Sequence, residues 1–225
     1  MTPEQNALFD LVTWDFPGAA IEAESFRRIE AEVPPEQRAR FSPSEWHIAR
    51  RLVHTTADFS ILPHLRFSGD PVEAGRAALR RGALIYSDSN MIKAGLSVPK
   101  LKRFHPGYTR DSILCEVASP DVAELAKREN ITRALAAVKL HEHELGGSIF
   151  LCGNAPLALA GMIRMIVEGG PRPALIVGMP VGFVNVLESK ELLKLVDVPY
   201  ITLEGRRGGS PLAVAALHAV MEDFL

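Results

Sequence analysis

The sequence predicts an α/β fold in three layers, an α/β/α arrangement in which helices cover both faces of a mainly parallel central sheet. From residue 83 onward, short continuous apolar runs alternate with segments of helical periodicity. This alternation is typical of parallel strands that are buried on both faces. Hydrophobic residues make up 47% and charged residues 23% of the chain, which supports a full core and argues against disorder.

The chain of 225 residues has the length of one domain with a short N-terminal extension. Residues 1–20 show weak periodicity and contain Pro3, Pro17 and Gly18, so we expect a loosely ordered extension there. Residues 21–225 are then predicted to form a single domain. Its first helix covers residues 20–32, and Pro34 and the proline after it end that helix.

The next helix has a clear start signal. Ser42 and Glu45 have the spacing of a capping box, and Pro43 occupies the first helical position. An apolar stripe follows at helical spacing, so the helix is predicted to run to about Ala57. A further helix over residues 71–81 again begins at a proline.

The remaining elements follow from the apolar runs and the segments between them. The predicted strands cover residues 83–86, 112–117, 149–152, 174–177 and 200–203. The predicted helices cover residues 121–145 with a break near Asn130, 156–168, 188–196 and 210–224.

Four polar or glycine-rich segments come directly after predicted strands. They are Ser87-Asp88-Ser89-Asn90, residues 153–156, residues 178–182 and residues 205–210. Because parallel strands end at the same edge of a sheet, we expect these four loops to gather at its carboxyl edge, where such folds bind ligands. Ordinary strand-to-helix turns explain one or two such loops more easily than four.

The sequence lacks the motifs that mark several other classes of protein. No P-loop, G-x-G-x-x-G or G-x-S-x-G motif occurs. The net charge is −2, and the sequence has no block of basic residues that would favour binding to nucleic acid. Cys115 and Cys152 lie in apolar runs and form neither a disulfide framework nor a metal site. The longest apolar stretch, residues 155–167, is too short to cross a membrane and no signal peptide is visible. We therefore expect a soluble cytoplasmic protein.

The capped helix carries an unusual set of side chains. His47, Arg51, His54 and Asp58 have the spacing of one helix face. Because an imidazole titrates near neutrality, such a histidine can take and return a proton. A solvated, charged helix face explains the same spacing, and periodicity alone does not decide between the two.

The order and spacing of several short motifs resemble the precorrin-8X methylmutase family over about residues 20–220. These motifs are Ser25-Phe26, Arg51-Leu-Val-His54, Asp88 with Met91 and Gly95, Thr132-Arg133, Gly153-Asn-Ala-Pro156, Gly178-Met-Pro-Val-Gly-Phe-Val184, Glu188-Ser-Lys190 and Gly208-Gly-Ser210. The run Gly178 to Val184, followed by Glu188-Ser-Lys190, is the most specific part.

The resemblance implies an isomerase of cobalamin biosynthesis that is a cytoplasmic homodimer with an α/β/α fold. Family members move a methyl group from C-11 to C-12 of precorrin-8X, or of cobalt-precorrin-8, and yield hydrogenobyrinate or its cobalt counterpart. No cofactor and no metal bound by the protein take part. The family's catalytic histidine corresponds to His54. The substrate's acetate and propionate arms suit arginines and glycine-rich turns, so the expected substrate contacts are Ser25, Arg51, Arg133, Asn154, Gly208, Gly209 and Ser210.

Three departures from the family pattern affect secondary contacts. Thr55-Thr56-Ala57 follows His54 where relatives often have a Cys-Gly pair, and Asn90 stands where they have Glu. The segment from Lys100 to Asp111 is longer than expected.

Two other functions stay open. A methyltransferase that uses S-adenosylmethionine would need a glycine-rich loop after the first strand, and a non-catalytic tetrapyrrole-binding protein would need no histidine at position 54.

Overall fold

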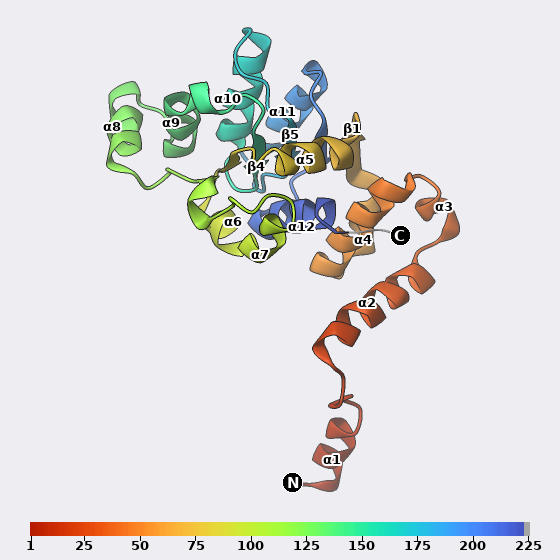
Figure 1. Ribbon diagram of the computed structural model, residues 1–225. Helices are drawn as coiled ribbons and strands as arrows, with labels where there is room; N and C mark the ends of the chain where they lie inside the picture. The colour runs from red at the N-terminus through yellow and green to blue at the C-terminus, as the bar shows by residue number, and fades with distance from the viewer. Residues whose placement is uncertain (223–225) are drawn as a thin grey trace.

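Six strands form one sheet in the order β1-β6-β5-β4-β2-β3 in a computed structural model that describes residues 1–222 (Figure 1). All neighbouring pairs are parallel except β1 and β6, which pair antiparallel at one edge. The strands are β1 Leu65–Ser68, β2 Ile85–Ser87, β3 Ile113–Leu114, β4 Ile149–Cys152, β5 Leu175–Gly178 and β6 Tyr200–Leu203. The prediction of a mainly parallel sheet is therefore confirmed.

Two strands differ from the prediction. β1 was not predicted, because Leu65–Ser68 alternates apolar and polar residues and contains no continuous apolar run. Its strand conformation depends on pairing with β6, where Leu65 lies opposite Leu203. At the other edge, β3 is confined to Ile113–Leu114, within the longer run predicted over residues 112–117.

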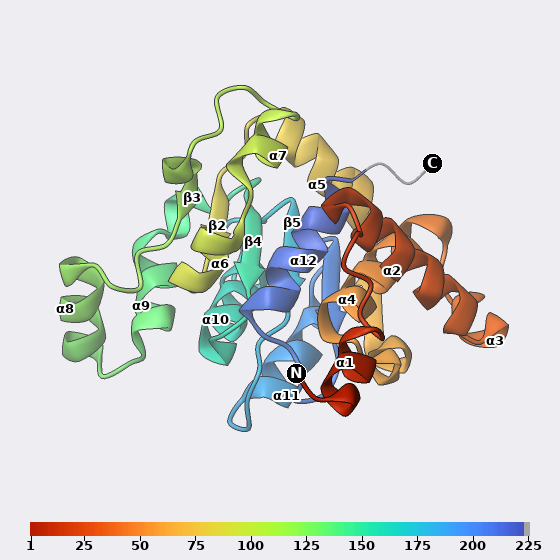
Figure 2. The same ribbon diagram turned by 90° about the horizontal axis from the view of Figure 1, so that it is seen from below.

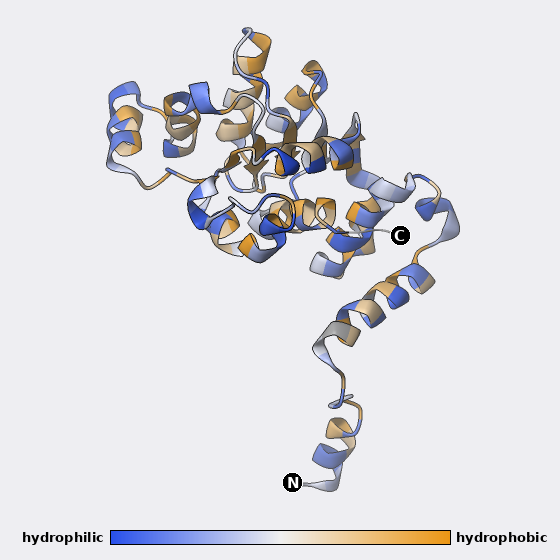
Figure 3. Ribbon diagram, viewed as in Figure 1, coloured by the Kyte–Doolittle hydropathy of each residue, from blue (hydrophilic) through white to orange (hydrophobic). Residues whose placement is uncertain are grey.

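The sheet separates two apolar cores. In β4 and β5, Leu151 and Val177 belong to the core on one face, whereas Phe150 and Ile176 belong to the core on the other. The strands consequently form the hydrophobic centre of the molecule (Figure 3). This is the pattern expected for strands that are covered on both sides.

One layer of helices is built around α12, Ser210–Val220. This helix packs against α4, Pro43–Thr56, against α5, Pro71–Arg80, and against α6, Asn90–Gly95 (Figure 2). A short helix α7, Val98–Lys102, follows α6. The last helix was predicted to reach residue 224, but α12 ends at Val220, and residues 223–225 lie outside the described part of the chain.

The opposite layer contains α9, Arg133–Leu140, α10, Pro156–Val167, and α11, Val186–Glu191. The break predicted near Asn130 is confirmed, because Asn130 adopts a left-handed conformation with φ 52° after α8, Pro120–Glu129. Short 3₁₀ turns follow α9 and α11, at Glu142–Glu144 and Leu192–Leu195. Helices on both faces confirm the predicted three layers.

The N-terminal segment leaves the body of the molecule (Figure 1). It contains α1, Pro3–Phe9, then α2, Gly18–Glu32, and α3, Pro35–Arg38. Residues 1–18 are exposed throughout. The helix α1 was not expected in a loosely ordered extension, and the capping box of Thr2 and Gln5 explains its start. The division into residues 1–20 and 21–225 remains a prediction. Within residues 1–222, no helix combines the length and the apolar character needed to cross a membrane.

Candidate active site

The helix α4 begins as its sequence predicts. The Ser42 hydroxyl accepts a hydrogen bond from the Glu45 backbone at 3.3 Å, and the Glu45 carboxylate accepts one from the Ser42 backbone at 2.8 Å. The helix ends where Ala57 turns left-handed, with φ 52°. Asp58 thus lies outside the helix, and the prediction that it shares a helix face with His47, Arg51 and His54 is wrong. It instead caps the 3₁₀ turn Phe59–His64 and accepts a hydrogen bond from Arg207 at 2.7 Å.

His54 lies in the last turn of α4 and is held from α2. Nδ1 of its ring is 2.7 Å from the Ser25 hydroxyl oxygen, and its ring meets that of Phe26 edge-on at 5.2 Å between centroids. No hydrogen bond within residues 1–222 involves Nε2 of His54. One nitrogen is therefore engaged by the protein, while the other remains available to a ligand.

Arg51, one turn before His54, is already bound to carboxylates of its own chain. Its guanidinium donates to both oxygens of Glu22, at 2.9 and 3.1 Å, and to Glu222 at 2.5 Å. It also stacks over the Phe26 ring at 4.8 Å. Arg51 is only 8% exposed, whereas the Glu22 side chain is 49% exposed. A substrate carboxylate would therefore have to replace Glu22 to reach this predicted contact.

Asp88 organises the first two of the four predicted loops. Its buried carboxylate accepts backbone hydrogen bonds from Gly153 at 3.1 Å, Asn154 at 2.7 Å and Ala155 at 2.6 Å. Burial raises the pKa of the Asp88 carboxyl, although these three N–H donors oppose the shift. Asn154 is exposed, and its backbone rather than its side chain makes this link.

The loop before α12 closes onto its neighbours. Gly209 donates a backbone hydrogen bond to the Met179 carbonyl at 2.8 Å, and the Ser210 and Ser89 hydroxyls are 2.8 Å apart. A Cβ at Gly208 would collide with the carbonyl oxygens of the Met179–Pro180 backbone. The four loops therefore gather at one edge of the sheet, as predicted.

Lys190 binds the backbone of the same loop, residues 205–210. Its buried ammonium donates to the carbonyls of Gly205 at 2.8 Å and Arg207 at 2.7 Å. Burial lowers the pKa of Lys190 to about 8. Lys190 belongs to the most specific motif of the sequence, and its hydrogen bonds to the backbone of this loop give it a structural role there.

Arg133 is not brought near His54 within one chain. It occupies the first position of α9, where it is exposed. The helices α9 and α4 lie on opposite sides of the molecule in both views (Figures 1 and 2). Ser25, Arg51 and His54 form one group, and Asn154 with Gly208 to Ser210 forms another at the carboxyl edge of the sheet. Arg207, beside Gly208, joins the two groups through Asp58, which lies four residues after His54.

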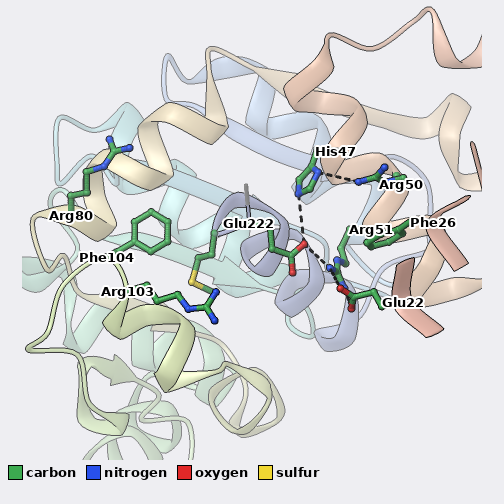
Figure 4. A pocket seen from close by; sticks show the side chains of 10 residues that line it. Glu22, Phe26, His47, Arg50, Arg51, Arg80, Arg103, Phe104 and Glu222 are labelled. Atoms are coloured by element: carbon green, nitrogen blue, oxygen red, sulfur yellow. Dashed lines mark hydrogen bonds and ion pairs between the residues drawn. The ribbon is translucent and has the colours of Figure 1, made fainter. Parts of the chain in front are cut away.

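The structure adds residues that no motif indicated. Glu22 and Glu222 both bind Arg51, and together with Arg103 they line a cavity of about 550 Å³ next to α4 (Figure 4). Their role depends on contacts between distant segments, so the sequence carries no local signal for it. Among residues 1–222, no group of three or more His, Cys, Asp or Glu side chains is arranged to hold a metal ion.

The sequence profile of the precorrin-8X methylmutase family matches residues 20–223. The chain belongs to this family. A cobalt-precorrin-8 methylmutase of Priestia megaterium is 40% identical over 200 residues, which cover 89% of this chain and 85% of the relative. A precorrin-8X methylmutase of Pseudomonas aeruginosa is 38% identical over 208 residues, covering 92% and 96%. The crystal structure of precorrin-8X methylmutase from Thermus thermophilus is 46% identical with a TM-score of 0.80, and covers 91% of this chain and 95% of that one.

Membership of the precorrin-8X methylmutase family confirms the resemblance drawn from the motifs. The structural match covers 91% of this chain, so the family fold is shared as well. Neither comparison tests the individual site residues. Their roles are proposals that rest on the geometry above.

Proposed function

We propose that this chain is an isomerase that moves a methyl group from C-11 to C-12 of precorrin-8X or cobalt-precorrin-8 in cobalamin biosynthesis. The products are hydrogenobyrinate and its cobalt counterpart. Family membership and the names of the relatives support the reaction class. One observation on this chain supports the chemistry most directly, namely His54 with one ring nitrogen bound to Ser25 and the other unengaged.

The reaction needs little from the protein beyond binding and a proton. A methyl shift within one molecule breaks the bond to C-11 as it forms the bond to C-12, so no nucleophile and no external methyl donor take part. His54 Nε2 protonates the macrocycle, which favours the rearranging tautomer, and recovers the proton afterwards. The remaining rate enhancement comes from tighter binding of the distorted ring than of the substrate.

The substrate's carboxylate arms give the protein its binding energy. Arg51 lies one turn from His54 and exchanges the half-exposed Glu22 for a substrate carboxylate. The loop from Gly208 to Ser210 and the exposed Asn154 supply contacts at the edge of the sheet. Ser25 acts mainly through His54, since its hydroxyl is bound to the ring.

A direct assay tests the proposed function. The purified protein is incubated with precorrin-8X, and separately with cobalt-precorrin-8, while the visible spectrum of the corrinoid is recorded. We expect conversion of at least one of them to the product spectrum without added metal or nucleotide. Tight binding of hydrogenobyrinic acid without any conversion would instead indicate a tetrapyrrole carrier. An absence of both would contradict the family function for this chain.

We propose further that the protein acts as a homodimer in the cytoplasm, as the family resemblance implies. Residues 1–17 support the dimer, because they carry apolar side chains that are exposed in one chain: Leu8, Phe9, Leu11, Val12, Trp14 and Phe16. Burial of such side chains against a second copy would stabilise a dimer. Sedimentation of the full chain should give a dimer mass, and a double change, Leu11→Ser with Trp14→Ser, should shift it toward the monomer. A wild-type protein that is monomeric and fully active would contradict the proposed dimer. Cell fractionation tests whether the protein is in the cytoplasm.

Arg133 fits the site only through the dimer, since α9 and α4 lie on opposite sides of one chain. In a mixed dimer of a His54→Ala chain and an Arg133→Ala chain, one site would then carry both changes and the other neither. Equal mixing of the two inactive variants should restore about a quarter of the wild-type activity, because half of the dimers are mixed and one of their two sites is intact. No recovery would place Arg133 outside the partner's site.

A further inference from the structure

A cavity rich in arginine lies against the middle of α4 (Figure 4). Its volume is about 550 Å³, and its lining is more polar than apolar: Glu22, Phe26, His47, Arg50, Arg51, Arg80, Arg103, Phe104, Met221 and Glu222. Four arginines face two glutamates, so the lining has an excess of positive charge. No motif in the sequence indicates this cavity, and none of the expected substrate contacts except Arg51 belongs to it.

The cavity already holds a carboxylate with several cationic partners. Glu222 is bound to Arg51 at 2.5 Å and to Lys100 at 2.7 Å, and its carboxylate lies 3.6 Å from Nε2 of His47. Burial disfavours the charged form of Glu222, but hydrogen bonds from His47, Lys100 and Arg51 outweigh it and hold the pKa well below its usual range. The groups around this cavity are therefore arranged to keep a carboxylate ionised.

Two further arginines of the lining are not committed to this network. The guanidinium of Arg103 makes no hydrogen bond or ion pair within residues 1–222. The Arg80 side chain makes one ion pair within the described part of the chain, at 3.1 Å with Glu73, and both side chains are more than half exposed. Pairs of this kind contribute little to stability and exchange readily. Both arginines can accept a new anionic partner without breaking a strong contact.

The cavity is continuous with the surroundings of His54. Arg51 lines it and lies three residues, about 4.5 Å, from His54 along the axis of α4. Phe26 lines it as well, and its ring is in edge contact with the His54 ring. A polycarboxylate whose core lies at His54 can therefore extend one of its arms into the cavity.

We propose that this cavity is a binding subsite for carboxylate arms of the corrinoid, with Arg103 as its principal contact and Arg80 as an auxiliary one. This inference rests on the proposed function. Arg103 lies in the segment from Lys100 to Asp111, which is longer than the family pattern led us to expect. The segment anchors the cavity through Lys100 and Glu222 and presents Arg103 to it. This segment thus gains a role in substrate recognition.

The test compares the binding of hydrogenobyrinic acid and of its fully amidated form to the full-length protein and its variants. Arg103→Gln should weaken binding of the acid by about tenfold, the loss expected for one charge-assisted hydrogen bond. Binding of the amidated form should change little, because it has no carboxylate to lose. Arg128→Gln, at an exposed arginine of α8, is the matched control and should bind both compounds as the wild type does.

The outcomes separate this inference from the proposed function. If the wild type does not bind the acid, the proposed function fails and the subsite fails with it. If the wild type binds the acid and Arg103→Gln binds it equally well, the subsite alone is contradicted. An equal loss for acid and amidated form would show that Arg103 acts by packing, which also overturns the proposal. Arg103→Lys should retain part of the affinity for the acid, since it keeps the charge but not the fork.

Discussion

The hydroxyl oxygen of Ser25 lies 2.7 Å from Nδ1 of His54. The two residues come from different helices, α2 and α4, so the contact links the N-terminal helices to the body of the molecule. It engages one ring nitrogen and thereby limits rotation of the imidazole. Ser25 was expected to contact the substrate directly, and the geometry instead makes it a positioning residue for His54.

Replacement of Ser25 by Ala should lower the turnover rate about five- to tenfold, the effect of one lost hydrogen bond. The Michaelis constant should stay nearly constant, because the carboxylate contacts remain. Ser25→Thr keeps a hydroxyl and should restore most of the rate. Steady-state kinetics of the three proteins would check this. A raised Michaelis constant with unchanged turnover would make Ser25 a substrate contact after all.

Replacement of His54 by Ala should lower turnover by at least about 100-fold, the lower end of what a general acid supplies. Because His54 is half-buried near the protein surface, the fold should survive, and hydrogenobyrinic acid should bind only moderately less tightly. His143, which is exposed in the turn after α9, offers a matched control, and His143→Ala should be fully active. His47 is unsuitable as a control because it is buried against Glu222. Wild-type turnover by His54→Ala would show that binding alone drives the shift.

The Gly208→Ala change should disrupt the loop before α12. The added Cβ would lie 2.6 Å from the Pro180 carbonyl oxygen and still closer to that of Met179, and backbone atoms cannot move aside cheaply. We expect weaker corrinoid binding and a lower melting temperature. Gly146→Ala is the matched control, because its Cβ would meet only Pro171, at 3.9 Å. Equal thermal stability of the two variants would contradict the tight packing of this loop.

His218 predicts a pH dependence of stability. Burial, followed by the nearby Lys100 cation, lowers its pKa to about 4, and its Nε2 accepts a hydrogen bond from the Ser97 backbone at 3.2 Å. Between pH 6.5 and 4 the unfolded chain binds a proton that the folded chain does not, so folding stability falls as the pH falls through this window. The loss attributable to His218 should reach roughly 2–3 kcal/mol.

Comparison with His218→Gln isolates this contribution from the many carboxylates that titrate nearby. Denaturant unfolding at pH 7 and at pH 4.5 gives the free energy of unfolding of both proteins. The wild type should lose more stability than the variant on acidification. Parallel losses in the two proteins would mean that His218 does not titrate in this window.

The features that the sequence determined by itself are those set by neighbouring residues. Ser42, Pro43 and Glu45 start α4 because capping is a matter of three residues. Four of the strands are confirmed because runs such as Ile149–Cys152 are apolar throughout, and burial on both faces needs nothing more. The order of strands and loops then brings the loops after β2, β4, β5 and β6 to one edge, since parallel strands end together.

Tertiary structure alone decided which side chains meet. β1 is a strand because β6 pairs with it, and Asp58 leaves the expected helix face because Ala57 turns left-handed and Arg207 binds it. The carboxylates that occupy Arg51 come from residues 22 and 222, at opposite ends of the chain. These contacts depend on the packing of α2, α4 and the residues that follow α12. A local sequence pattern cannot predict them, because the segments that meet are far apart in the sequence.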